Sequence, residues 1–251
     1  MGLSFRVDFF SGILFQITRL ILQVMVWKGL YIGRTEVMGI ALSDMLTYTV
    51  LSLMMSLLVG DYDLMFWIND DVQDGSIVER LTVPIGFGRY YIWRTLAAKP
   101  ATFLTQILPV VLPAALLFGV RISVDPLDIL AAFVAGVLAF AIMTGYGFIM
   151  GLTVLWLKNS YFLVVVTALI WQLFSGALVP MWFFPNWLET AGRFLPFRYV
   201  VFEPISILMG KTPPEQIPAE LCFAAAWAAG LCALALLLWL RGRRRLFVNG
   251  G

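Results

Sequence analysis

Long apolar runs separated by short polar segments are the feature that most constrains what this chain can fold into. A helix needs roughly 18–20 consecutive apolar residues to cross a bilayer, and the runs are about that long. They are continuous and lack the alternating pattern that strands of membrane barrels show. The sequence therefore predicts an all-α membrane protein that forms one transmembrane domain over residues 1–251. Its six predicted transmembrane helices cover about 9–31, 43–64, 95–120, 127–157, 160–180 and 219–240.

The composition excludes several other classes of protein. Only 13% of the residues are charged and 61% are hydrophobic, whereas a soluble domain carries about 25% charged residues. The absence of histidine removes His-based acid–base chemistry and Ser-His-Asp sites. Cys222 and Cys232 lie roughly 15 Å apart on one predicted helix and cannot pair with each other. We therefore expect no catalytic or metal site, and the basic residues, placed at the ends of the runs, give no sign of a nucleic-acid partner.

One long polar stretch, Asn69–Arg94, connects the second and third predicted helices. Its first half is mostly acidic, and Ile77, Val78 and Leu81 form an apolar patch on a short predicted helix that ends at Pro84. A short helix with acidic flanks, held between two spans, suits docking into a groove on another protein, whereas the alternative is a solvated loop. The candidate docking residues are Asp70, Asp71, Asp74, Gly75, Ile77, Val78, Glu79, Arg80 and Leu81.

The segment 181–217 breaks the pattern of long runs. It is rich in aromatic residues, is interrupted by prolines and carries several charges. We expect two short helices that dip into the membrane as a re-entrant hairpin, with Asn186 capping the first. Irregular backbone cannot face lipid, so this hairpin must be buried against other helices. Glu203 is either a gate or substrate contact, or an ion partner for Arg198 five residues earlier.

Polar side chains within the apolar runs are expensive in lipid and are therefore candidates for a transport path. Arg19, near the middle of the first run, faces other helices or a water-filled cavity; a role in a substrate path or helix contact and a role in a buried ion pair both fit. Together with intramembrane glutamines and many aromatic residues, it suits a hydrophobic or amphipathic substrate. The candidate residues for a transport path or gate are Arg19, Gln172, Phe174 and Glu203.

Prolines and glycines predict local features of two of the helices. Pro109 and Pro113 stand one turn apart in the third run and predict a bend there. Gly147 and Gly151 stand four apart in the fourth run, a spacing that lets helices approach closely. Asp125 followed by Pro126 predicts the start of that helix, with the aspartate as its cap.

The distribution of basic residues predicts the orientation in the membrane. Ten lie on the side of the polar stretch and the chain ends, against six on the other side, and positive charge favours the cytosol. This places both termini and the connection 65–94 in the cytosol, and the hairpin 181–217 on the outer face. The ten are Arg6, Arg80, Arg89, Arg94, Lys99, Lys158, Arg241, Arg243, Arg244 and Arg245, and the six are Lys28, Arg34, Arg121, Arg193, Arg198 and Lys211.

Several sequence motifs carry a resemblance to a known family. Asp71–Pro84 follows D-x-x-x-G-S-I-x-E-R-L-x-x-P, and Ser175–Leu188 follows S-G-A-L-V-P-x-x-F-F-P-x-W-L. L-P-F-R-Y at Leu195–Tyr199 and a basic tail ending in V-N-G-G come after them. With six predicted spans, the chain resembles, over essentially its whole length, the permease subunits of type-2 ABC exporters, specifically the viologen-exporter-like permeases.

The resemblance implies a function and an assembly. The connection between helices 2 and 3 would hold the coupling helix that docks on an ATPase, and the connection between helices 5 and 6 would hold the outer re-entrant hairpin. Two cytosolic ABC ATPase subunits, which bind ATP and Mg²⁺, would drive two permease subunits, identical or homologous, to export substrate by alternating access across a bacterial inner membrane. This chain would itself bind no cofactor.

A partner ATPase is also expected from the residues alone. Gly210-Lys211-Thr212 imitates the end of a phosphate-binding loop, but the required earlier glycine is replaced by Ile205 and no strand precedes it. The chain therefore lacks the means to hydrolyse ATP. Two other functions stay open as alternatives: a passive membrane channel or scaffold, which gives no reason for the acidic stretch, and a membrane-embedded lipid-modifying enzyme.

Overall fold

The computed structural model describes residues 2–60, 63–82, 84–123, 125–157 and 161–248, and within these ranges the chain is almost entirely helical. The strands in this part of the chain form one small antiparallel hairpin of β1 (Glu36–Val37) and β2 (Ile40–Ala41). Among the described residues, five segments are long and apolar enough to cross a membrane, so the chain is a multi-pass helical membrane protein. They are Phe10–Leu30, Leu42–Gln73, Phe87–Phe118, Pro126–Leu155 and Ile217–Arg243.

The segment predicted as the fifth crossing, 160–180, is helical over part of its length. It forms α8 (Tyr161–Phe174), a helix of 14 residues, and then turns through Gly176, whose φ is +80°. At about 1.5 Å per residue such a helix is shorter than a hydrocarbon core of about 30 Å. A full sixth crossing therefore stays a prediction.

The first two long segments contain α1 (Gly2–Leu30), α2 (Leu42–Leu58) and α3 (Asp63–Gln73). The helix α2 ends earlier than the predicted 43–64, and most of the connection predicted as a loop at 65–94 is helical. It contains the end of α3, then α4 (Ile77–Thr82), and then the start of α5 (Phe87–Thr102). The expected short helix at Ile77 is present, and the third helix begins at Phe87 rather than near 95.

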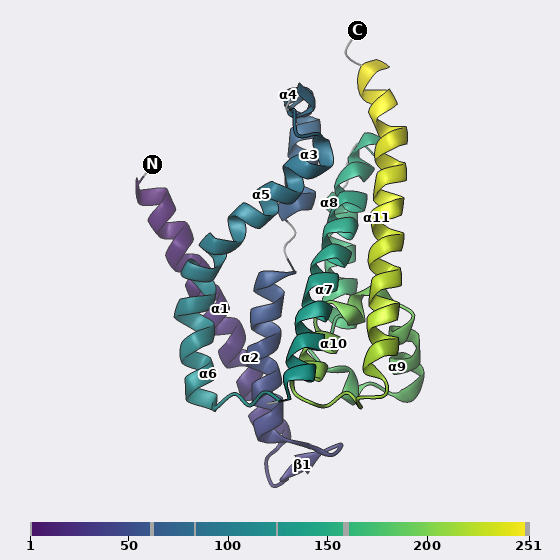
Figure 1. Ribbon diagram of the computed structural model, residues 1–251. Coiled ribbons are helices and arrows are strands. Elements are labelled where there is room, and N and C mark those ends of the chain that lie inside the picture. The colour runs from purple at the N-terminus through teal and green to yellow at the C-terminus, as the bar shows by residue number, and fades with distance from the viewer. Residues whose placement is uncertain (1, 61–62, 83, 124, 158–160, 249–251) are drawn as a thin grey trace.

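Prolines divide the third long segment into parts. After α5 the chain continues as a π-helix, η1 (Phe103–Val111), and then as α6 (Leu112–Phe118). Pro109 lies in η1 and Pro113 in the first turn of α6. Each lacks an N–H and removes an α-helical hydrogen bond, and π-helical turns are a common site of kinks. Figure 1 shows the bend that follows between α5 and α6, as the two prolines predict.

The centre of the bundle is α7 (Pro126–Leu152), which continues as the short turn η2 (Thr153–Leu155). The Asp125 side chain accepts a hydrogen bond from the Leu127 amide at 2.8 Å, which confirms the predicted cap. The helix α7 runs beside α11 (Ile217–Val248), as Figure 1 shows. A Cβ added at Gly145 would lie 3.1 Å from the backbone of Cys232, so the two helices touch almost backbone to backbone.

The predicted close approach at Gly147 and Gly151 is also present, and it packs α3 on α7. A Cβ at Gly147 would lie 2.8 Å from Leu64 Cδ2, and one at Gly151 would lie 2.8 Å from Ile68 Cβ. Leu64 and Ile68 stand one turn apart on α3, so the two contacts are in register. The glycine pair thereby fixes the height at which α3 meets the bundle.

We expect Gly151→Ala to destabilise the protein although alanine is the better helix former. The added methyl overlaps Ile68, and overpacking of this kind costs about 1–3 kcal/mol. Gly136→Ala on the same helix is the matched control, because a Cβ there meets nothing within 4 Å, and we expect it to stabilise by up to about 1 kcal/mol. Unfolding in mixed SDS micelles measures both, and equal effects would contradict the packing of α3 on Gly151.

A second set of contacts buries the irregular part of the chain. It contains η3 (Met181–Phe183), α9 (Asn186–Arg193), η4 (Pro196–Tyr199) and α10 (Phe202–Leu208). Two short α-helices are thus present, as expected. Asn186 is not the cap of the first, because Pro185 occupies the cap position and no side chain hydrogen-bonds to that end.

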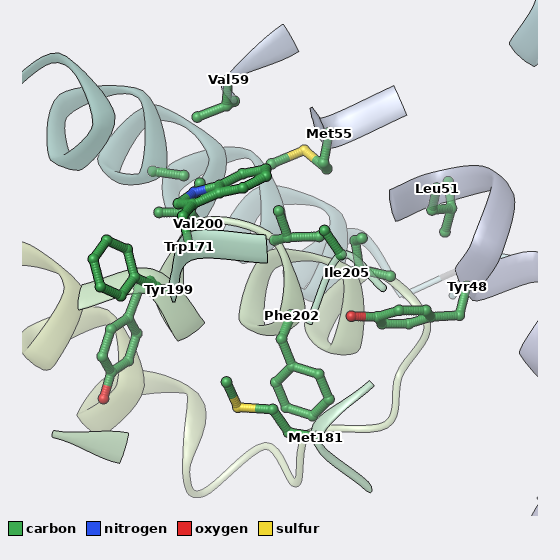
Figure 2. Packing of buried hydrophobic residues seen from close by; sticks show 14 of the residues in the cluster. Tyr48, Leu51, Met55, Val59, Trp171, Met181, Tyr199, Val200, Phe202 and Ile205 are labelled. Carbon is green, nitrogen blue, oxygen red and sulfur yellow. The ribbon is translucent and has the colours of Figure 1, made fainter. Parts of the chain in front are cut away.

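A hydrophobic cluster holds this irregular segment against α2 and α8 (Figure 2). Tyr48 and Trp171 pack there with Tyr199, Phe202 and other residues of the segment. Tyr48 donates a hydrogen bond to the Gly176 carbonyl at 2.8 Å, and a Cβ at Gly176 would lie only 2.6 Å from that hydroxyl. The positive φ and this contact both require glycine in the Ser175–Leu188 motif.

The two ends of the bundle carry different elements. Figure 1 shows the start of α1, the end of α11 and the short helix α4 at one end. The β-hairpin and α9 lie toward the opposite end. This arrangement separates the candidate docking element from the irregular segment along the axis of the bundle.

Candidate functional site

The connection between α3 and α5 is built around one buried carboxylate, that of Asp71 on α3. Its Oδ2 accepts hydrogen bonds from the Tyr91 hydroxyl at 2.6 Å and from Arg80 Nε at 3.2 Å. Its Oδ1 accepts one from the Ser76 hydroxyl at 3.0 Å, and Arg94 Nη1 lies 3.9 Å from Oδ2. Asp71 thus joins α3, the turn before α4, α4 itself and α5.

Turn geometry and aromatic contacts add to the stiffness of this connection. The Ser76 amide donates to Asp74 Oδ1 at 2.9 Å, a side-chain turn that starts α4 after Gly75, whose φ is +80°. The Arg94 guanidinium stacks 4.2 Å from the centre of the Trp67 ring. These contacts hold α4 in a fixed position between α3 and α5.

The structure divides the predicted docking residues into two groups. Asp71 and Ile77 point inward: Asp71 is 7% exposed, and Ile77 is 2% exposed and packs with Leu64, Ile68 and Tyr91. Their side chains make contacts inside the chain, and a direct part of these two in docking stays a prediction. Arg80 is half-buried beside Asp71, and the side chain of Leu81 lies outside the described residues. The exposed members are Asp70, Asp74, Gly75, Val78 and Glu79.

A polar cavity of about 420 Å³ lies deeper in the bundle, between α1, α2, α3, η1 and α8. Arg19 and Asp63 bring opposite charges to its wall, and Phe15, Phe66 and Trp171 bring aromatic rings. Such a mixture is rare inside a membrane helix bundle, where ionisable groups mark cavities and paths. The other polar lining residues are Gln16, Ser56, Thr102, Gln106 and Gln172.

The cavity contains hydrogen-bonding capacity that the described chain does not use. Gln16 Nε2 donates to Gln106 Oε1 at 3.4 Å, but Gln16 Oε1 has no partner, nor has the Ser56 hydroxyl. Buried polar atoms of this kind are normally paired with protein, water or ligand. The cavity is therefore suited to hold a guest with polar groups.

The cavity gathers two of the four candidate path residues. Arg19 and Gln172 both line it. Phe174 lies two residues after Gln172 on α8, is half-buried and packs instead against the cluster of Figure 2. Glu203 lies in α10, within a separate ionic cluster.

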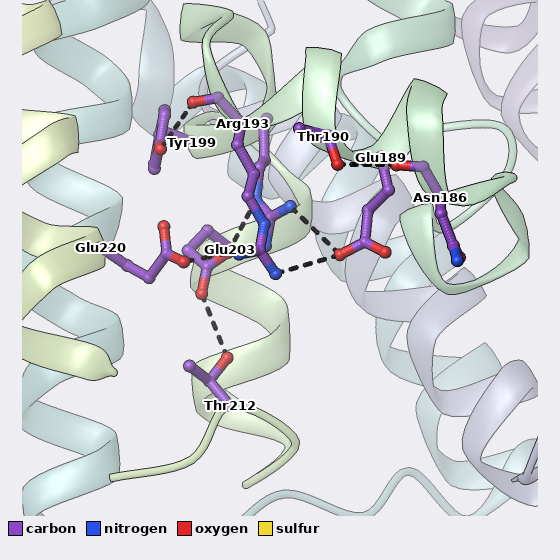
Figure 3. Close-up of polar contacts among 9 residues, drawn as sticks. Asn186, Glu189, Thr190, Arg193, Tyr199, Glu203, Thr212 and Glu220 are labelled. Atoms are coloured by element: carbon purple, nitrogen blue, oxygen red, sulfur yellow. Dashed lines mark hydrogen bonds and ion pairs between the residues drawn. The ribbon is translucent and has the colours of Figure 1, made fainter. Parts of the chain in front are cut away.

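Arg198 is the centre of that ionic cluster, and Figure 3 shows its members Glu189, Glu203, Thr212 and Glu220. Its Nε and Nη2 each lie 3.1 Å from Glu203 Oε2. Its guanidinium also lies 3.9 Å from Glu189 and 4.0 Å from Glu220. Thr212 donates to the other oxygen of Glu203 at 3.1 Å. Of the two alternatives for Glu203, the structure shows the ion pair with Arg198.

The cluster ties four parts of the chain together, because its members come from α9, η4, α10 and the start of α11. Arg198, Glu203 and Glu220 are all less than 9% exposed. Burial raises the pKa of Glu203, the Arg198 guanidinium lowers it in part, and the Glu220 carboxylate raises it further. One arginine therefore neutralises closely spaced carboxylates that would otherwise repel one another.

The segment Gly210-Lys211-Thr212, which imitates the end of a phosphate-binding loop, makes contacts within the chain. Lys211 Nζ donates to Asp44 Oδ2 at 2.6 Å, and Thr212 bonds to Glu203 as above. These contacts link the turn before α11 to α2 and α10. Among the described residues no group of His, Cys, Asp or Glu is arranged to hold a metal ion.

Sequence reasoning missed several members of these sites. Asp63 and Glu220 lie near the ends of predicted spans, and no role is predicted for either of them. The signal that could have found Gln16 is its spacing from Arg19, three residues along one helix face. For Glu220 no local signal exists, because its partner Arg198 lies 22 residues away and on another element.

Helices of this length and hydrophobicity, with charges confined to a few internal clusters, define a multi-pass helical membrane protein. A family model described as ABC-2 family transporter protein matches residues 17–250, which is most of the chain. The chain therefore belongs to the ABC-2 family of transporter proteins, and the resemblance to type-2 ABC permeases is confirmed. Comparisons with curated proteins and with solved structures find no match. Membership of this transporter family implies a membrane setting and an ATP-binding partner.

Proposed function

We propose that this chain is the permease subunit of an ATP-driven exporter, of the viologen-exporter-like type, in a bacterial inner membrane. In this proposal two cytosolic ATPase subunits, which bind ATP and Mg²⁺, drive two permease subunits, identical or homologous. The termini and α4 lie in the cytosol, and the segment from η3 to α10 is the outer re-entrant hairpin. The permease moves a hydrophobic or amphipathic substrate outward by alternating access.

The observation that carries the proposal is the rigid mounting of α4. Asp71 bonds it to α3 and α5 at once. The helix α3 is seated on α7 through Gly147 and Gly151, and α5 continues into η1. A push on α4 is therefore transmitted to the transmembrane helices instead of being lost in loop motion. This is the mechanical property that a coupling helix requires.

The polar cavity supports the assignment of substrate class. Its charged and amide groups can bind the polar part of a guest, and its aromatic rings can contact an apolar part. Its walls include α1, α2 and α3, and α3 leads directly to α4. A movement of α4 would thus change the shape of the cavity, which is how ATP binding could alter substrate affinity.

We expect the double substitution Asp70→Lys/Asp74→Lys to weaken the contact with the ATPase at least tenfold. Both side chains are exposed beside α4, so reversing their charge alters the docking surface without disturbing the Asp71 contacts. Asp74 also forms the turn before α4, so Asp74→Asn, which keeps that hydrogen bond, is tested alongside. The measurement is recovery of the ATPase with the tagged permease from native membranes.

Glu36→Lys is the matched control, because Glu36 is exposed on the β-hairpin at the opposite end of the bundle. It should leave ATPase recovery unchanged. Full recovery of the ATPase and normal transport with the double substitution would show that α4 is not the docking element. So would labelling from outside the cell of a cysteine placed at Val78.

A further inference from the structure

An apolar groove of about 220 Å³ lies between α5, α7 and α11, away from the polar cavity. The rings of Phe87 and Trp239 stack in its wall, with centroids 3.7 Å apart and planes 3° from parallel. The two walls on α7 and α11 meet closely at Gly145 and Cys232. The groove is therefore narrow, almost wholly hydrocarbon and bounded by rigid aromatic surface.

Gly88 leaves one side of the groove open. A Cβ added there would meet nothing within 4 Å, although the residue lies in α5 beside the buried Phe87. Because glycine has no side chain, position 88 leaves this part of the apolar groove unfilled. The groove is thus accessible to a long apolar guest.

Arginines stand next to this groove on two of its helices. Arg243 follows Trp239 by four residues and Leu236 by seven, so it continues the groove face of α11 beyond the apolar part. Arg89 directly follows Gly88 on α5. Both are exposed and, in the described chain, neither makes an ion pair, whereas Arg80 and Arg94 are held by Asp71. Two cations that form no ion pair among the described residues thus lie on the helices of the groove, Arg243 one turn beyond Trp239 and Arg89 beside Gly88.

We propose that this groove is a binding site for an anionic glycerophospholipid of the leaflet that faces α4. One acyl chain lies in the groove against Phe87, Gly88 and Trp239. The phosphate lies between Arg243 and Arg89, which neutralise it. The inference is independent of whether α4 docks on an ATPase, because it uses neither Asp71 nor the exposed acidic residues.

The charges argue for a lipid over a second copy of the chain. In a two-fold contact centred on this groove, both copies would bring their Arg89 and Arg243 to one interface. That contact would bury like charges without compensation. An anionic phospholipid offers the opposite charge and an apolar chain in one molecule, and so matches both halves of the site.

The experiment is native mass spectrometry of the full-length protein, titrated with dioleoyl phosphatidylglycerol or with dioleoyl phosphatidylcholine. The two probes share their acyl chains and differ in head-group charge. We expect the wild-type protein to bind the anionic lipid more tightly. The double variant Arg89→Gln/Arg243→Gln should weaken phosphatidylglycerol binding about thirtyfold, because each arginine near the membrane surface contributes about 1 kcal/mol. Binding of phosphatidylcholine should stay nearly unchanged. Arg34→Gln, at the other end of the bundle, is the control for loss of a cation.

Gly88→Leu tests the apolar half of the site. Its side chain fills the groove, so binding of both lipids should fall at least tenfold. Gly230→Leu on α11 is the matched control, because that position is exposed, does not line the groove and has open space for a Cβ. Unchanged lipid binding in Gly88→Leu, or a retained preference for phosphatidylglycerol in the double arginine variant, would overturn the proposal. If Gly88→Leu changed the fraction of dimer instead of the number of bound lipids, a second copy of the chain would cover the groove. That result would also overturn the proposal.

Discussion

The substitution Asp71→Ala is expected to uncouple ATP hydrolysis from transport while leaving the transmembrane helices in place. It removes the acceptor of three side-chain hydrogen bonds, from Tyr91, Ser76 and Arg80. Tyr91 is fully buried, so its hydroxyl is left without its partner. The Arg80 side chain is 31% exposed and is partly screened by solvent. We therefore expect a cost of about 2–4 kcal/mol, most of it from the buried hydroxyl and the lost charged acceptor.

The loss should be local, because Asp71 joins elements at one end of the bundle only. Hydrogen exchange at 77–82 should rise by at least a factor of ten, whereas α7 should stay protected. Substrate transport per ATP hydrolysed, measured in proteoliposomes with the partner ATPase, should fall as hydrogen exchange at 77–82 rises.

Asp70→Ala is the matched control for Asp71→Ala. It removes a carboxylate one residue earlier on the same helix, but an exposed one. It should leave exchange at 77–82 unchanged. If the two variants behaved alike, or if Asp71→Ala left exchange at α4 unaltered, the rigid mounting of α4 would not depend on this carboxylate.

The substitution Arg198→Met is expected to be the most destabilising change in the segment from η3 to α10. It leaves the buried Glu203 and Glu220 without the cation that neutralises both. Removing one partner of a buried ion pair costs about 3–5 kcal/mol. The midpoint of unfolding in mixed SDS micelles should fall accordingly, and α9 and α10 should become susceptible to protease.

Arg193→Met is the control for Arg198→Met, since Arg193 also pairs with Glu189, at 3.2 Å, but its side chain is 52% exposed. An exposed pair of this spacing contributes about 0.3–0.5 kcal/mol, so the control should barely change stability. Adding Glu203→Gln to Arg198→Met should recover part of the loss, because it removes the uncompensated charge. Equal effects of the two arginine variants, or no recovery, would contradict the view that Arg198 acts by neutralising buried carboxylates.

The sequence predicted the features that depend on local chemistry. Runs of apolar residues fix membrane helices because only a helix satisfies its own backbone in lipid. The cap at Asp125, the bend at Pro109 and Pro113, and the short helix at Ile77 followed from groups that act within a few residues of themselves. The close contact at Gly147 and Gly151 followed from a spacing on one helix face.

Other features depended on which segments meet in space. Asp71 and Ile77 looked like surface residues because acidic and apolar side chains flank them in sequence, but Tyr91, 20 residues later, turns Asp71 inward. The fifth run looked long enough to cross a membrane, yet the contact between Tyr48 and Gly176 holds the chain in a turn where the run would have continued.

By itself the sequence determined the class of this protein: helices that must lie in a membrane, joined by one long polar connection. Only the tertiary structure decided which polar groups are exposed on the surface and which are buried in contacts within the chain. The physical reason is that burying a charge is favourable only beside its partner, and the partners of Asp71, Glu203 and Glu220 come from other helices. The sequence does not specify those distances, whereas packing does.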